Sequence, residues 1–134
     1  MSETEKPAGG GQPTKERKPY DLEERTFEFA RRVRALVRTL PRTVCNIEDG
    51  KQLVRASGAV GSNYIEANES LGSKDFVMHL RISRKEAKES RFWLRLLYAD
   101  AGSAADGERN VLVQEAVELM RIFGSMVRKK EHGG

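Results

Sequence analysis

The sequence predicts an all-α protein, an antiparallel up-down four-helix bundle with a disordered N-terminal tail. Apolar residues recur at steps of three and four in four separate segments, which is the period of an α-helix. Short connections join these segments, so consecutive helices are expected to run antiparallel. No segment shows the alternation of a β-strand or the longer period of a repeat protein. We therefore expect the bundle over residues 20–128, a tail over residues 1–19 and a frayed end over residues 129–134.

The composition is that of a globular chain. Hydrophobic residues make up 38% and charged residues 33% of the 134 positions, and no run approaches the roughly 20 apolar residues of a membrane span. The first 19 residues are polar, include three prolines and lack the apolar core of a secretory signal. The single cysteine, Cys45, excludes an intramolecular disulfide and fits a reducing compartment. We expect a cytoplasmic protein that does not contact a membrane.

The first two helices are expected from Asp21 to Leu40 and from Asn46 to Leu71. Asp21 opens a pattern similar to a capping box, and Pro41 stops the first helix. Asn46 is the expected N-cap of the second helix, which Gly72 follows. Gly61 lies beside its apolar stripe, where another backbone can approach closely. The two stripes are Leu22, Phe29, Val33, Leu36, Val37 and Leu40, and Leu53, Ala56, Val60, Tyr64, Ala67 and Leu71.

The third helix is expected to begin at Ser73 as its N-cap and to carry a heptad-like seam that includes small residues. The fourth helix follows a loop over residues 101–107. The third-helix seam is Phe76, Leu80, Ser83, Ala87, Ser90, Leu94 and Leu97, and the fourth-helix stripe is Val113, Ala116, Val117, Met120, Phe123 and Val127.

Charge alternates from helix to helix. Residues 21–42 and 73–100 are net basic, whereas residues 46–72 and 101–124 each carry two bases and four acids. In an up-down bundle the two basic helices are diagonal, so each neighbours two acidic helices. One interpretation is that this alternation selects the correct helix neighbours, although exposed ion pairs contribute little each.

The second interpretation is a surface for nucleic acid. Arginines and lysines recur along the outward faces of the first and third helices, and such stripes can follow phosphate oxygens. The predicted nucleic-acid-binding residues are Arg31, Arg34 and Arg38 in the first helix and Arg81, Arg84, Lys85, Lys88, Arg91 and Arg95 in the third.

The third and fourth helices carry more apolar residues than one bundle face needs. A second stripe in each helix predicts self-association, because large apolar patches mark interfaces. Scattered exposed apolar residues are the alternative. The second stripes are Met78, Ile82, Trp93 and Leu96, and Leu112, Leu119, Ile122 and Met126. The predicted oligomer interface is Met78, Ile82, Trp93, Leu96, Leu119 and Ile122.

Catalytic signatures are missing from the sequence. Glu66 with Glu69 and Glu86 with Glu89 form two E-x-x-E pairs, but no histidine follows at the spacing that di-iron bundles use. Ion pairing with arginines is the simpler reading of these carboxylates. No nucleophile motif or phosphate-binding glycine loop is present. We expect no catalytic residues, no metal and no cofactor, and therefore a protein that is not an enzyme.

Four stretches form a recognisable set: YDLEERTFEFA (Tyr20–Ala30), GSNYIEANES (Gly61–Ser70), KDF (Lys74–Phe76) and ISRKEAKESRFWLRLL (Ile82–Leu97). Over about residues 20 to 125, the chain resembles the bacterial four-helix-bundle proteins encoded by 23S rRNA intervening sequences. That family is similar to the accessory variability proteins of diversity-generating retroelements, which are basic pentamers that bind nucleic acid and a reverse transcriptase.

The resemblance implies a homo-oligomer, a pentamer by analogy, with RNA or a reverse transcriptase as partner. The net charge of +4 is lower than that of the accessory proteins. The sequence thus favours a non-enzymatic, homo-oligomeric bundle that binds RNA or a nucleoprotein partner through its basic stripes. A structural or protein-interaction module without nucleic-acid binding is the alternative.

Overall fold

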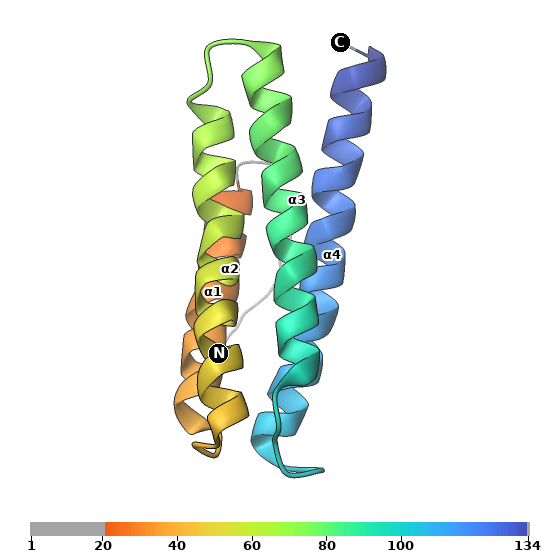
Figure 1. Cartoon of the computed structure of the whole chain (residues 1–134). Helices are drawn as coiled ribbons and strands as arrows, with labels where there is room; N and C mark the ends of the chain where they lie inside the picture. The colour runs from red at the N-terminus through yellow and green to blue at the C-terminus, as the bar shows by residue number, and fades with distance from the viewer. Residues whose placement is uncertain (1–20, 134) are drawn as a thin grey trace, which may run out of the picture.

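The computed structural model describes residues 21–133, which form four antiparallel helices (Figure 1). These are α1 (Asp21–Thr39), α2 (Val44–Asn68), α3 (Ser73–Leu96) and α4 (Ala104–Gly133). Each helix packs on the next, and α4 returns to α1, so α1 is diagonal to α3. The predicted four-helix bundle is confirmed, whereas the predicted tail over residues 1–19 lies outside the described residues.

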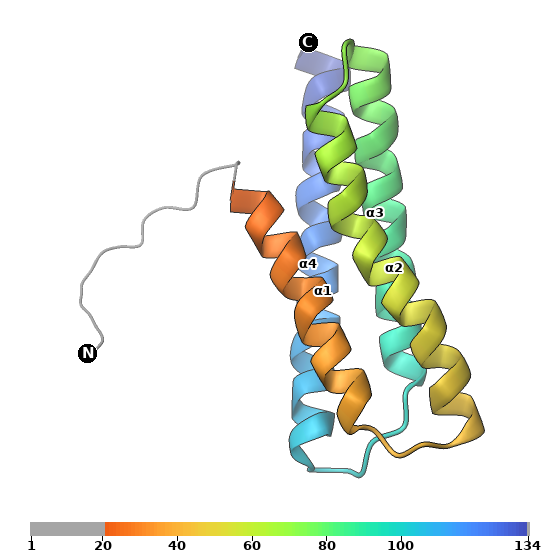
Figure 2. The same cartoon turned by 90° about the vertical axis from the view of Figure 1, so that its left-hand side faces the viewer.

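The helices differ in length, and α1 is the shortest. It runs along only part of the other three, which extend beyond its N-terminal end (Figure 2). The α1–α2 and α3–α4 connections lie at one end of the bundle, and the α2–α3 connection lies with the C-terminus at the other (Figure 1). No helix in the described part of the chain combines the length and the apolar character needed to cross a membrane.

The predicted seam of α3 packs in the core. Leu80, Ala87 and Leu94 are fully buried, together with Ser83 and Ser90. Both serine hydroxyls are hydrogen-bonded: Ser83 Oγ donates to Val60 O of α2 at 2.9 Å, and Ser90 Oγ donates to Glu86 O of its own helix at 2.8 Å. Small side chains along this seam allow α2 and α4 to approach α3 closely.

The close approach expected at Gly61 is also present. A Cβ atom built on Gly61 would lie 2.7 Å from Thr26 Oγ1 of α1. Thr26 is buried, and its hydroxyl donates to Leu22 O at 2.7 Å. The backbone of α2 therefore touches α1 at a point where no side chain larger than hydrogen fits without a shift.

Two predicted features of α2 are wrong. The N-cap is Thr43, whose side chain accepts the Asn46 N–H at 3.1 Å, because α2 already begins at Val44. At the other end α2 stops at Asn68, since the Glu69 N–H bonds back to Ile65 O and Glu66 O. Leu71 therefore lies outside the helix and is fully exposed rather than in the core. Gly72 precedes α3 as its N-cap, and Ser73 is the first residue of that helix.

The rotation of α4 also differs from the prediction. Its core face is Leu112, Ala116, Leu119, Phe123 and Val127, whereas Val113, Val117 and Met120 are only half-buried. The prediction that Leu119 lies in an oligomer interface is therefore wrong, since this side chain is fully buried inside one chain. Both faces of α4 are apolar, so periodicity did not identify the one that faces the core. The helix continues to Gly133, where a frayed end was expected from residue 129.

Candidate nucleic-acid interface

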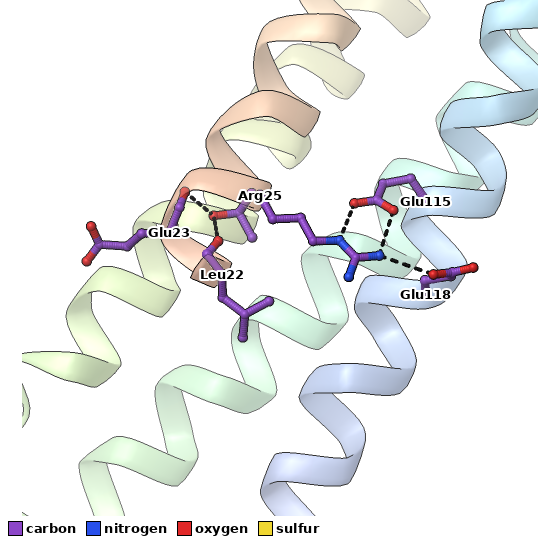
Figure 3. Close-up of polar contacts among 6 residues, drawn as sticks. Leu22, Glu23, Arg25, Glu115 and Glu118 are labelled. Atoms are coloured by element: carbon purple, nitrogen blue, oxygen red, sulfur yellow. Dashed lines mark hydrogen bonds and ion pairs between the residues drawn. The ribbon is translucent and has the colours of Figure 1, made fainter. Parts of the chain in front are cut away.

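Three acidic residues of α4, Glu108, Glu115 and Glu118, face α1. Arg25 donates from Nε and Nη2 to the two carboxylate oxygens of Glu115 at 2.7 and 2.8 Å, and from Nη2 to Glu118 at 3.1 Å (Figure 3). Arg32 makes the same two-pronged contact with Glu108, at 2.8 Å for both bonds. Hydrogen bonding to Glu115 raises the pKa of Arg25. Here a basic helix does pair with its acidic neighbour, as the charge alternation predicts.

The opposite flank of α4 is basic and faces α3. An open groove of about 630 Å³ runs between these two helices. Arg84 and Arg91 line it from α3, and Arg121 and Arg128 line it from α4. We call this feature the arginine groove. Gln114, Val117, Met120 and Gly124 complete its lining, so no carboxylate is among the described residues that form it.

Gly124 brings guanidinium groups of two helices together. A Cβ atom at this position would lie 3.4 Å from Arg128 Nη1, 3.5 Å from Arg84 Cδ and 3.8 Å from Arg84 Nη1. The two cations therefore converge over the same point of the α4 backbone. Neighbouring like charges repel each other, and an anion bound between them would relieve the repulsion.

None of the four groove arginines has a carboxylate partner within the described part of the chain. The nearest ion pair along this flank is that of Arg81 with Glu131, one turn towards the C-terminus of α4. Guanidinium groups offer paired donors that match phosphate and carboxylate oxygens. The arrangement is therefore suited to a polyanion that runs along the two helices.

The structure brings together only part of the predicted basic set. Arg84 and Arg91 line the arginine groove, and Lys88 and Arg95 are exposed one turn away on the same face of α3. Lys85 lies further round, beside Met78 and Ile82 in a separate hollow. Arg121 and Arg128 are the functional candidates that sequence analysis missed. Arg121 belongs to residues 101–124, which are net acidic as a whole, and Arg128 is the last residue of the expected bundle.

The predicted stripe on α1 does not join this surface, since α1 and α3 are diagonal. Arg31 bonds with Glu28 of its own helix at 2.7 Å. Arg34 is half-buried and donates to the backbone oxygens of Ala30 and Val54, at 3.0 and 3.4 Å. Arg38 is exposed. Two of the three α1 arginines thus already have intramolecular partners.

The predicted interface residues other than Leu119 lie at or near the surface. Met78 and Leu96 are 46% and 50% exposed, whereas Ile82, Trp93 and Ile122 are half-buried. Phe92, which the prediction omitted, is 53% exposed and makes an edge-on contact with Trp93 at 5.0 Å between ring centroids. The outer face of α3 therefore displays several large apolar side chains.

The E-x-x-E carboxylates of α2 and α3 differ in exposure. Glu66 and Glu69 are exposed, and burial together with the nearby Glu89 charge raises the pKa of Glu86. Among the described residues, no three histidine, cysteine or acidic side chains gather closely enough to hold a metal ion.

Residues 19–125 match the model of the 23S rRNA-intervening sequence protein family. No curated protein matches the chain. A crystal structure of a protein with unknown function from the S23 ribosomal protein family of Bacteroides thetaiotaomicron is similar, with a TM-score of 0.66 and 25% identity. The similarity covers 79% of this chain and 97% of that chain. Because the family model spans most of the sequence, the chain belongs to the 23S rRNA-intervening sequence protein family.

Proposed function

We propose that this protein is a non-enzymatic, cytoplasmic homo-oligomer that binds the phosphate backbone of RNA in the arginine groove. The observation that carries the proposal is the convergence of four arginines from two helices in a groove without a carboxylate. Folding alone gains nothing from placing these cations together. Binding of successive phosphates would offset their repulsion and release counterions.

The oligomeric part of the proposal rests on the exposed apolar side chains of α3, including Met78 and Leu96. Resemblance to the accessory variability proteins suggests a pentamer, with RNA or a reverse transcriptase as partner. Family membership and the name of the S23 ribosomal protein family fit a partner that contains RNA.

Binding of a fluorescein-labelled single-stranded RNA, followed by anisotropy over a range of salt concentrations, tests the proposal. Affinity should fall steeply with salt, by a log–log slope of about −0.7 for each phosphate neutralised on a single strand. The double variant Arg84→Glu/Arg128→Glu should bind at least about tenfold more weakly at low salt and show a shallower slope.

The matched control is Arg31→Glu/Arg38→Glu, which changes the net charge equally on the diagonal helix α1. Its affinity should stay close to that of the wild type. An equal loss in both variants would show that binding is spread over the surface, not confined to the groove. Absence of binding at low salt would favour the alternative function, a protein-interaction module in which bases such as Arg25 and Arg32 only pair with α4.

A further inference from the structure

A second basic groove lies between α1 and α2, at the end of the bundle where these helices are connected. Its volume is about 590 Å³. Val37, Leu40, Ile47 and Val54 give it apolar surface, and no carboxylate is among the described residues that line it. We call it the α1–α2 groove. Its composition suits a partner that is apolar in the middle and acidic beside the apolar part.

Two glycines of α2 keep this groove open. A Cβ atom on Gly58 would lie 3.3 Å from Arg34 Nη2, and one on Gly50 would lie 3.4 Å from Val37. Four bases line the groove, namely Arg34, Arg42, Lys51 and Arg55. Lys51 and Arg55 are exposed and stand one turn apart on α2, and Lys51 also makes an exposed ion pair with Glu48 of its own helix at 3.5 Å.

The outer face of α3 has the complementary character. Ile82, Glu86, Glu89, Trp93 and Leu96 follow one another at steps of four, three, four and three, so they form one stripe along the helix. We call this stripe the apolar–acidic seam. Its two carboxylates make no ion pair with another described residue. Leu96 is 50% exposed, and Trp93 is half-buried.

The groove and the seam lie at the same level of the bundle. Two hydrogen bonds fix the level of α2 relative to α3. Ser83 Oγ of α3 donates to Val60 O at 2.9 Å, and the Tyr98 N–H, two residues after α3 ends, donates to Asn46 Oδ1 at 2.8 Å. On α3, seam residues 86–96 lie between these two hydrogen bonds. On α2, groove residues 47–58 lie between the same two hydrogen bonds. A second copy that is related to the first by rotation about an axis parallel to the helices can therefore place its seam against the groove of the first. No shift along the helices is needed.

We propose that the α1–α2 groove of one copy receives the apolar–acidic seam of a second copy. Trp93 and Leu96 cover the apolar part of the groove, and Glu86 and Glu89 meet Lys51 and Arg55. The two surfaces differ, so the contact is head-to-tail and repeats until a ring closes. This inference rests on the self-association proposed above and names the surfaces that carry it.

Charge reversal tests the pairing by light scattering at micromolar concentration. The wild type should have a mass several times the 15.1 kDa of one chain. Lys51→Glu/Arg55→Glu and Glu86→Arg/Glu89→Arg should each fall to the mass of one chain, because like charges then meet. The four-site variant that combines both pairs should recover the wild-type mass. Far-UV circular dichroism should be unchanged, since Lys51, Arg55 and Glu89 are exposed and Glu86 is only half-buried, outside the core.

The matched control is Lys74→Glu/Lys129→Glu, which reverses two exposed bases outside the groove and should keep the wild-type mass. A monomeric wild type would overturn both the self-association and this inference. An oligomeric wild type whose mass survives Lys51→Glu/Arg55→Glu would overturn this inference alone. Neither result depends on RNA binding, which uses the other flank of α3.

Discussion

Asn46 joins two connections at one end of the bundle. Its Nδ2 donates to Pro41 O at 3.0 Å and to Tyr98 O at 2.9 Å, while its Oδ1 accepts the Tyr98 N–H at 2.8 Å. The residue is only 4% exposed, so water does not replace these bonds. An asparagine near a helix start predicts a cap, and the sequence does not indicate that its partner lies 52 residues further along.

Asn46→Ala should therefore lower the free energy of unfolding by about 2–3 kcal/mol, because it leaves Tyr98 with unsatisfied backbone groups. Urea titration followed by circular dichroism measures this change. Asn110→Ala, at an exposed position of α4, serves as the control and should change stability by less than about 0.5 kcal/mol. Equal effects of the two substitutions would contradict the bridging role of Asn46.

At the scale of helices, the separation of α1 from α2 is set at Gly61. The added Cβ of Gly61→Ala would lie 2.7 Å from Thr26 Oγ1, so the two helices must move apart. We expect a loss of about 1–3 kcal/mol in the free energy of unfolding. Gly107→Ala is the matched control, since nothing lies within 4 Å of its Cβ and α4 should gain up to about 1 kcal/mol. Thermal unfolding compares them, and destabilisation by both would argue against the contact.

Periodicity predicted the helices well and the charged surface only in part. The buried stripe of α3 was identified because one face of that helix is apolar or small, from Leu80 to Leu94. The rotation of α4 was not, because residues on two faces, such as Leu119 and Val113, are apolar. The arginine groove could be predicted only if the rotation of α4 was known, because Arg121 and Arg128 line the groove from α4. The net charge of α4 does not reveal the groove, because acidic and basic residues lie on different flanks of the helix. Glu115 faces α1, whereas Arg121 faces α3.

At the scale of the whole molecule, the arginine groove and the α1–α2 groove lie between different pairs of helices. Arg84 and Arg91 face α4, whereas Lys51 and Arg55 line the groove between α1 and α2. Assembly through the α1–α2 groove leaves the arginine groove uncovered. A ring then presents one arginine groove per copy, and a long RNA can occupy several of them at once.

This arrangement predicts that assembly strengthens the binding of long RNA but not of short RNA. Glu86→Arg/Glu89→Arg dissociates the proposed ring while it adds positive charge, so simple electrostatics would make every RNA bind more tightly. We instead expect affinity for an RNA of about forty nucleotides to fall by about 10²-fold, because several linked sites become single sites. An RNA of about six nucleotides, which fills one site, should bind at least as well as it binds the wild type.

Anisotropy titrations at one salt concentration measure the affinity of both RNAs for the wild type and for Glu86→Arg/Glu89→Arg. The ratio of long-RNA to short-RNA affinity in each protein decides this point. Restoration of long-RNA affinity in the four-site variant would tie the loss to assembly, not to the arginines that replace Glu86 and Glu89. If the long RNA binds the dissociated variant more tightly than the wild type, charge alone governs affinity. Each arginine groove then acts by itself, and the ring contributes nothing to RNA binding.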